Sequence, residues 1–279
     1  MPIPRTDRLY PKDNKNKEDT DVLGAAARRE LTSLLTAIFE LSSRQWMEKH
    51  LLCLEEGLGL HLGCGGGENT FLIASLLGKK AVVYGIDEDP ALIETARQKK
   101  ALSGPEHVHF AQASLYLWKV DTMYDFIYTR IQTAAAPNPE KWPIGLARNL
   151  QTGGVLLAEI LSPSGFRAYP YNHAFARAME LIGRLEEAQP YGAEQLPGLL
   201  RPAGFAAIKT TYASPAFIPP ACNRIASLSL ECYRAEILRR GDSNREELNA
   251  LLQELRAYEQ QEDTLVSRPG VLQVWAKKD

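Results

Sequence analysis

Apolar residues follow two alternating spacings through the middle of the chain. Between residues 57 and 161, short apolar runs alternate with segments whose apolar positions recur every three or four residues. The runs predict buried strands, and the spaced segments predict helices packed on them. The strands are expected at 58–62, 81–86, 108–111, 124–129 and 155–160, and the helices at 70–77, from 90 onward and at 142–149. Five such repeats predict an α/β fold with a parallel sheet and right-handed crossovers.

The flanking segments have mainly helical patterns. Residues 23–54 carry one apolar face, formed by Leu31, Leu34, Leu35, Ile38 and Leu41 and extended by Trp46, Leu51 and Leu52. Further helices are expected around 175–182, 194–200, 222–239 and 245–261, and two more strands at 205–210 and 270–276. We therefore expect a seven-stranded, mostly parallel sheet with helices on both faces. Residues 22–279 would form one domain, with the N-terminal helices (22–56) and the inserted helices (162–200 and 216–262) as a cap. The polar, proline-containing residues 1–21 would form a mobile arm.

Composition and charge narrow the function classes. The 279 residues are 45% hydrophobic, and their net charge is -2, without the basic excess typical of proteins that bind nucleic acid. No apolar stretch approaches the roughly 18 residues of a membrane span, and no signal-peptide pattern is present. The four cysteines form no CxxC pair and the five histidines no metal-binding motif. We expect a cytoplasmic protein with reduced cysteines, no metal and a small-molecule partner; a homodimer stays open.

A glycine-rich turn stands where the first strand leads into a helix. The sequence Gly63-Cys64-Gly65-Gly66-Gly67 allows a tight turn and leaves backbone N–H groups open to a ligand at a helix N-terminus. Asp87 follows the second strand, 20 residues beyond Gly67, where a carboxylate can accept both hydroxyls of a ribose. Its alternative role, capping the next helix, is already filled by Asp89. Together these features predict a nucleoside-containing cofactor.

The spacing of the glycines separates two cofactor classes. A dinucleotide-binding turn has the pattern GxGxxG, whereas here position 68 is Glu and the glycines stand at 63, 65 and 67. The segments LHLGCGGG, VVYGIDEDP, VHFAQASLYL, YDFIYTR and NLQTGGVLLAEI resemble successive motifs of the class I S-adenosylmethionine-dependent methyltransferases. The resemblance extends over residues 22–279, implies a Rossmann-like sheet, and is closest to bacterial small-molecule enzymes of the ubiquinone/menaquinone-methyltransferase-like kind.

The resemblance implies S-adenosylmethionine as the cofactor and assigns its parts to residues of this chain. The methionine moiety would contact Gly63, Cys64, Gly65 and Gly67. Asp87 would bind the ribose, and Glu88, Ser114 and Leu115 would lie beside the adenine. Thr129 and Arg130 would lie beside the cofactor, where the substrate enters. Two positions depart from the family pattern. His61 stands where the family usually has an acid that holds the methionine ammonium, which predicts binding weaker by about 1–3 kcal/mol unless another acid compensates. The alternative for His61 is a strand histidine bonded to a backbone carbonyl. Ser114 replaces an Asp, which is a milder change because a hydroxyl still accepts a hydrogen bond.

Methyl transfer requires chiefly that a nucleophile be aligned with the sulfonium carbon, although a hydroxyl also benefits from a base. The candidate catalytic residues are His173 and Tyr128, with Glu159 as a third, and the alternative for His173 is an ordinary surface histidine. Aromatic residues predicted above the sheet edge favour an apolar or aromatic substrate, or else plain cap packing: Tyr10, Trp46, Phe166, Tyr169, Tyr171 and Phe217.

The sequence thus predicts methyl transfer to oxygen or carbon of a small organic molecule. The alternatives are a cyclisation or rearrangement with the same cofactor, and a non-catalytic binding protein with a decayed site.

Overall fold

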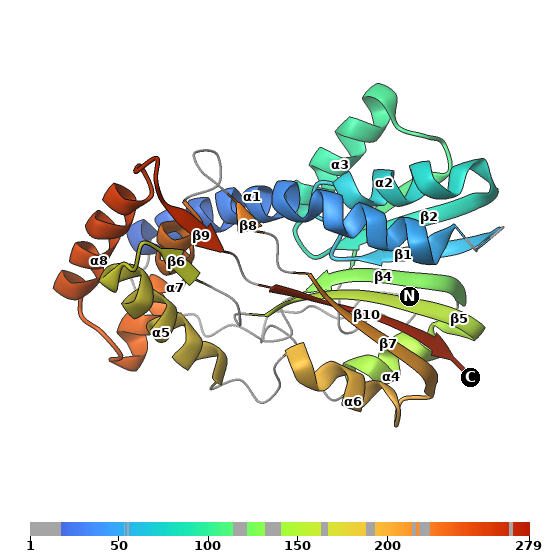
Figure 1. Ribbon diagram of the computed structural model, residues 1–279. Helices are drawn as coiled ribbons and strands as arrows, with labels where there is room; N and C mark the ends of the chain where they lie inside the picture. The colour runs from blue at the N-terminus through green and yellow to red at the C-terminus, as the bar shows by residue number, and fades with distance from the viewer. Residues whose placement is uncertain are drawn as a thin grey trace.

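The main sheet has seven strands and lies at the centre of the molecule (Figure 1). The computed structural model describes residues 18–52, 54, 56–113, 122–131, 141–162, 167–187, 193–213, 216–217, 224–267 and 270–279. The strands are β1 (Gly57–Leu62), β2 (Ala81–Asp87), β3 (Val108–Gln112), β4 (Tyr124–Ile131), β5 (Leu150–Ser162), β7 (Phe205–Ala213) and β10 (Gly270–Lys278). Their order is β3-β2-β1-β4-β5-β10-β7, with β10 antiparallel to both of its neighbours. The predicted mostly parallel α/β sheet is confirmed.

Helices cover both faces of this sheet. The helices α2 (Glu68–Leu77) and α3 (Pro90–Ser103) lie on one face, and α4 (Trp142–Arg148) and α6 (Leu196–Leu200) on the other (Figure 1). Short 3-10 turns at Gly78–Lys80 and Ala193–Gln195 precede β2 and α6. Asp89 caps α3 as predicted, because its carboxylate accepts the N–H of Ala91 at 2.8 Å.

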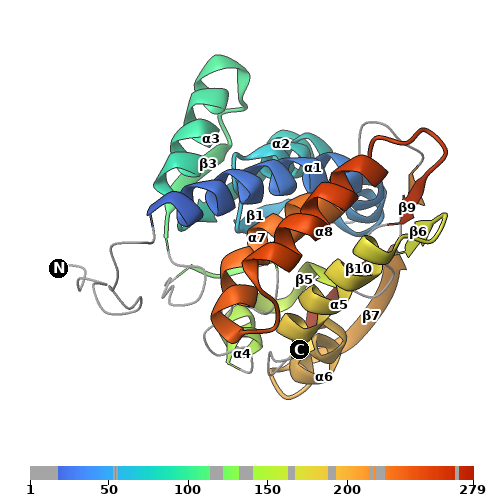
Figure 2. The same ribbon diagram turned by 90° about the vertical axis from the view of Figure 1, so that its left-hand side faces the viewer.

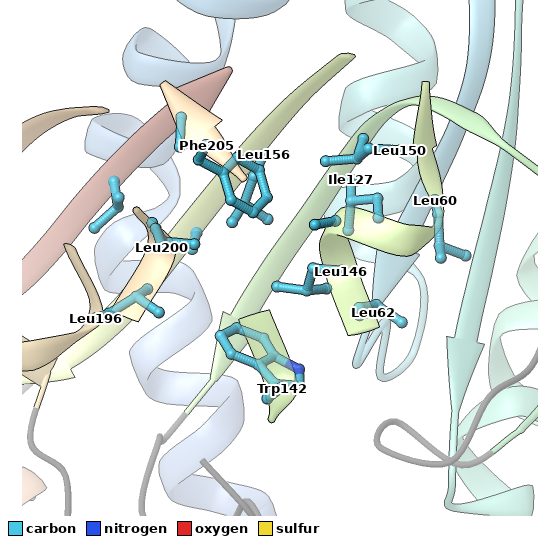
Figure 3. Close-up of a cluster of buried hydrophobic side chains, with 14 of the residues drawn as sticks. Leu60, Leu62, Ile127, Trp142, Leu146, Leu150, Leu156, Leu196, Leu200 and Phe205 are labelled. Atoms are coloured by element: carbon cyan, nitrogen blue, oxygen red, sulfur yellow. The ribbon is translucent and has the colours of Figure 1, made fainter. Parts of the chain in front are cut away.

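Alternate residues of each central strand enter two different cores. Leu60 and Leu62 of β1 join the side chains of α4 and α6, whereas His61 between them points to the side of α2. Figure 3 shows the first core, in which Trp142 and Leu146 of α4 pack beneath the strands. Burial on both faces explains why these strands appear in the sequence as continuous apolar runs.

Three helices form a cap beyond the edge at which the parallel strands end. They are α5 (His173–Glu187), α7 (Ile225–Arg240) and α8 (Arg245–Tyr258), and Figure 2 shows them in front of the sheet. The cap has an apolar core of its own, which includes Phe175, Leu230 and Leu255. The helix α6 belongs to the segment predicted as cap, but it packs on the sheet through Leu196 and Leu200 (Figure 3).

One long helix joins the cap to the sheet. The helix α1 (Glu18–Leu51) contacts α7 through Ala27 and Leu31, and its C-terminal part packs on the sheet core through Trp46. It is continuous where several helices were predicted, and its start lies inside the predicted arm, of which residues 1–17 are outside the described part. Leu52 was expected on the apolar face but is 61% exposed. Within the ranges given above, no helix is both long and apolar enough to cross a membrane.

A second, three-stranded sheet lies between the main sheet and the cap. The strands β6 (Arg167–Tyr169), β8 (Ala216–Phe217) and β9 (Leu265–Ser267) pair antiparallel in the order β6-β9-β8. They come from three of the connections between the main sheet and the cap helices. The sequence predicts only a connection over residues 162–173, because two- and three-residue strands show no measurable alternation.

A buried carboxyl group, Glu259, links two cap helices. It follows the end of α8 and accepts hydrogen bonds from the backbone N–H and the hydroxyl of Ser227, at 2.9 and 2.6 Å, in the first turn of α7. Burial raises the pKa of Glu259 to about 7, against the opposing effect of the bonds from Ser227.

This raised pKa predicts a pH-dependent stability. Between pH 4.5 and about 7 the unfolded chain loses the Glu259 proton while the folded chain keeps it, so stability falls as the pH rises. Relative to wild type, Glu259→Gln should gain roughly 1 kcal/mol of unfolding free energy per pH unit across this window. Urea denaturation at pH 5 and pH 7.5 checks this, with exposed Glu262→Gln as the control. An equal difference between variant and wild type at both pH values would contradict the role of Glu259.

Candidate active site

The glycine-rich turn between β1 and α2 is built as the sequence predicts. Gly63, Gly65 and Gly67 have φ angles of 72°, 53° and 90°, which residues other than glycine rarely adopt. The N–H groups of Gly63 and Cys64 donate to the carbonyl of Ile86 on β2, at 2.9 and 3.0 Å. No side chain caps α2 at Gly67, so the N–H groups of its first turn are left for a ligand.

Asp87 joins the glycine-rich turn to the turn between β2 and α3. Its Oδ2 accepts the N–H of Gly65 at 2.9 Å, and its Oδ1 accepts the N–H of Asp89 at 3.0 Å. The two predicted cofactor segments therefore meet at one carboxylate. Each of its oxygens has accepted one hydrogen bond and has a further lone pair for a hydroxyl.

The remaining cofactor candidates lie at the ends of β2, β3 and β4. Glu88 is exposed, and its carbonyl accepts the side-chain amide of Gln112 on β3 at 3.2 Å. Ser114 and Leu115 lie outside the described residues. Thr129 on β4 is fully buried, and its Oγ1 has no hydrogen-bond partner in the described part of the chain.

Cys64, predicted to lie beside the methionine moiety, is no nucleophile. Burial, and after it the charge of Asp87, raises the pKa of its thiol to about 12.

His61 is a buried, neutral histidine. Its Nδ1 is hydrogen-bonded to the hydroxyl of Thr70 on α2 at 2.7 Å, and its ring contacts that of Tyr128 with centroids 4.9 Å apart. Burial and then the charge of Arg130 lower its pKa to about 3. The partner is thus a hydroxyl on α2 and not the backbone carbonyl considered above.

The lowered pKa of His61 predicts loss of stability in acid. As the pH falls from 6.5 towards 3, the unfolded chain takes up a proton at His61 that the folded chain refuses. Wild type should therefore lose roughly 1 kcal/mol per pH unit relative to His61→Asn over that window. Urea denaturation at pH 7.5 and pH 5 measures the difference. His173→Asn, at an exposed position, is the control for replacing a histidine. A His61→Asn difference that does not change with pH would show that His61 takes up its proton equally in the folded and unfolded chain, which would contradict the lowered pKa.

Glu159 on β5 is the centre of a buried polar network, which we call the Glu159 network. Its carboxylate accepts hydrogen bonds from Ser43 of α1 (2.9 Å), Tyr128 (2.6 Å), Arg130 (3.1 and 3.3 Å) and Gln273 of β10 (2.8 Å). Arg130, Glu159 and Gln273 stand opposite one another on β4, β5 and β10. The carboxylate is fully buried and paired with a guanidinium that is 13% exposed.

Comparison with known proteins identifies the family of the chain. A family model described as a methyltransferase domain matches residues 59–209, which include the turn, Asp87 and the Glu159 network except Ser43 and Gln273. The chain belongs to this methyltransferase family. The predictions of a class I S-adenosylmethionine-dependent methyltransferase and of its cofactor are confirmed at this level. The ubiquinone/menaquinone-like subtype stays a prediction.

The similarity to individual proteins is low and covers only part of each sequence. The methyltransferase is 29% identical over 171 residues to a malonyl-[acyl-carrier protein] O-methyltransferase of Paenibacillus, covering 56% of this chain and 60% of the relative. It is 31% identical over 150 residues to a trans-aconitate 2-methyltransferase of Methylobacterium radiotolerans, covering 53% and 54%. The chain thus matches little more than half the length of these relatives. Among solved structures, the YcgJ protein of Bacillus subtilis has the same fold, with a TM-score of 0.55, 16% identity, and coverage of 85% and 98%.

The two candidate catalytic residues of this methyltransferase lie on different elements, β4 of the main sheet and α5 of the cap. Tyr128 is fully buried, and its hydroxyl donates to Glu159; burial raises its pKa well above the usual value. His173 begins α5 in the cap and is exposed. Hydrogen bonds and ring contacts join Tyr128 to predicted site residues, whereas none in the described part joins His173 to them.

The aromatic residues expected near the substrate lie in different parts of the fold. Trp46 is buried in the sheet core, while Tyr169 and Tyr171 are 71% and 77% exposed beside the three-stranded sheet. Phe217 lies on β8, and Tyr10 and Phe166 fall outside the described residues. Ser43, Thr70 and Gln273 join the site in the structure but are not predicted from the sequence. The signal that was available is a polar residue inside an otherwise apolar strand, as at Gln273 and Glu159, because such a residue needs a buried partner.

Proposed function

We propose that this methyltransferase binds S-adenosylmethionine at the glycine-rich turn and transfers its methyl group to oxygen of a small organic molecule. The observation that carries the proposal is the contact between Gly65 and Asp87. It places an acidic side chain against a glycine turn at the uncapped start of α2, which suits the ribose and methionine parts of one ligand.

The residues at the turn fit such a ligand. A Cβ at Gly65 would meet no atom within 4 Å, so the turn leaves room beside its backbone. Asp87 would accept the ribose hydroxyls, and the unpartnered hydroxyl of Thr129 would bond to the ligand at the end of β4. When bound, S-adenosylmethionine supplies an electrophilic methyl group. The chain's own contribution is then to orient the acceptor and exclude water.

His61 would not hold the methionine ammonium by charge, because the lowered pKa keeps its ring neutral. Glu159, the buried acid of the same region, is already paired with Arg130. We therefore keep the proposal that affinity is about 1–3 kcal/mol weaker than with an acid at position 61.

Oxygen is favoured as the acceptor atom by the names of the relatives. One is named an O-methyltransferase of a malonyl group, and the other is named for trans-aconitate, so both names point to carboxylic acids. Transfer to carbon, or to an apolar or aromatic acceptor, stays a prediction from the sequence. The cytoplasmic location and the homodimer stay predictions.

Methyl transfer is tested by incubating the protein with radiolabelled S-adenosylmethionine and a panel of small carboxylic acids, phenols and hydroxy acids. We expect S-adenosylhomocysteine to form in step with a labelled, base-labile ester. Consumption of an acceptor without S-adenosylhomocysteine would instead show a cyclisation or rearrangement. Binding of the cofactor without any reaction across the panel would favour a non-catalytic binding protein.

A further inference from the structure

The guanidinium of Arg130 has donors that the Glu159 network does not use. Its Nε donates to Glu159 at 3.3 Å, and its Nη2 donates to Glu159 at 3.1 Å and to Ser43 at 2.7 Å. Its Nη1, with two N–H groups, has no partner within the described residues. Nη1 is not among the buried side-chain atoms that lack a partner, so it is accessible, and its two N–H groups can donate to an acceptor that a ligand brings.

The other members of the network hold this guanidinium in place. Glu159 accepts bonds from four residues on α1, β4 and β10, so the orientation of its carboxylate is set from several sides. Ser43 accepts from Arg130 and donates to Glu159, which connects the arrangement to the helix that reaches the cap. A buried ion pair alone adds little to stability compared with apolar residues of similar volume. Four partners hold the Glu159 carboxylate, which with Ser43 fixes the guanidinium, and this points to a role of Arg130 in binding.

Arg130 also lies at the proposed methyl-transfer site. It follows Thr129 near the end of β4, and its positive charge contributes to the lowered pKa of His61 on β1. Its partner Glu159 balances the single positive charge of Arg130, so an arriving ligand meets an oriented donor group and not a strongly positive surface.

We propose that Arg130 binds a carboxylate in the active site, and that Glu159 and Ser43 are positioning residues that orient its Nη1. The inference rests on the proposed function, since it assigns a ligand group to the same site. A carboxylate can come from two sources there: the methionine part of the cofactor, or an acidic methyl acceptor. Guanidinium and carboxylate form charge-assisted hydrogen bonds, which suits either source.

The first arm of the test examines the cofactor. Calorimetry compares S-adenosylmethionine with decarboxylated S-adenosylmethionine, which lacks only the carboxylate. If Arg130 binds the cofactor carboxylate, wild type should favour S-adenosylmethionine at least tenfold, and Arg130→Gln should reduce this preference to within twofold.

The second arm examines the acceptor. Protein saturated with S-adenosylhomocysteine is titrated with trans-aconitate and with malonate, and with their methyl esters. If Arg130 binds the acceptor, at least one acid should bind wild type, its ester should not, and Arg130→Gln should weaken the acid at least tenfold. Glu159→Gln, which keeps the shape of the side chain, should weaken binding of the same acid several-fold.

Folding and specificity are controlled with three measurements. Arg130→Lys keeps a positive charge beside Glu159 and is expected to fold even if Arg130→Gln does not, while still losing carboxylate affinity, because an ammonium lacks the guanidinium fork. Arg177→Gln, on the surface of the cap, should change neither arm. Thermal melting confirms that each variant is folded.

The outcomes separate the two proposals. If wild type does not bind S-adenosylmethionine at all, the proposed function is wrong. If wild type binds the cofactor but shows no preference for its carboxylate and binds neither acid, or if folded Arg130 variants match wild type in both arms, only the present inference is overturned.

Discussion

Replacing Glu159 with alanine should lower the free energy of unfolding by about 3–5 kcal/mol, the scale expected when one partner of a buried ion pair is removed. The change leaves Arg130 mostly buried without a countercharge and removes the acceptor for Ser43, Tyr128 and Gln273. Urea denaturation monitored by tryptophan fluorescence measures the loss at pH 7.5.

The effect of this change can be separated from general damage to the core. Glu180→Ala removes a carboxylate whose side chain is 48% exposed and bridged to Arg177, and should cost less than about 1 kcal/mol. Replacing both Glu159 with Leu and Arg130 with Met should restore much of the stability, because no unpaired charge is left. A loss below about 1 kcal/mol for Glu159→Ala would mean that the carboxylate does not hold the network together.

Asp87→Ala should weaken binding of S-adenosylhomocysteine at least tenfold, which corresponds to about 1.4 kcal/mol or more. Two effects act together here. The ribose hydroxyls lose their acceptor, and the N–H groups of Gly65 and Asp89 lose the carboxylate that ties the two turns together. Calorimetry with S-adenosylhomocysteine measures the change, and methyl-transfer activity should fall in parallel.

The neighbouring acid provides a matched control for Asp87. Asp89 caps α3 and contacts Asp87 only through its own N–H, so Asp89→Ala should cost about 1 kcal/mol of stability and leave cofactor affinity within twofold. Affinity within twofold of wild type for Asp87→Ala would show that the ribose is bound elsewhere.

The parts of the fold that follow from local pattern were predictable. The central strands of the main sheet are buried on both faces, so they appear as apolar runs, and capping by Asp89 and Pro90 marks the start of α3. The place of α6 was not predictable, because an apolar helix face indicates burial but not its partner. The three-stranded sheet is held by pairings between short segments up to about 100 residues apart, which no local pattern records.

The candidate site also has a part that was predictable from the sequence and a part that was not. The turn and Asp87 are encoded by residue type and spacing, and the structure brings them into contact. The Glu159 network joins residues 29 to 116 positions apart in the sequence, each an ordinary polar residue by itself. Its assembly depends on the order of β4, β5 and β10 in the sheet and on the path of α1, which only the three-dimensional structure supplies.

Direct titration of the wild-type protein with S-adenosylmethionine is the most immediate test of its function as a methyltransferase. The structure predicts saturable binding of one cofactor per chain, weakened by Asp87→Ala and unaffected by Asp89→Ala. No detectable binding at millimolar cofactor would contradict the account, since every role proposed for the turn, Asp87 and Arg130 depends on it.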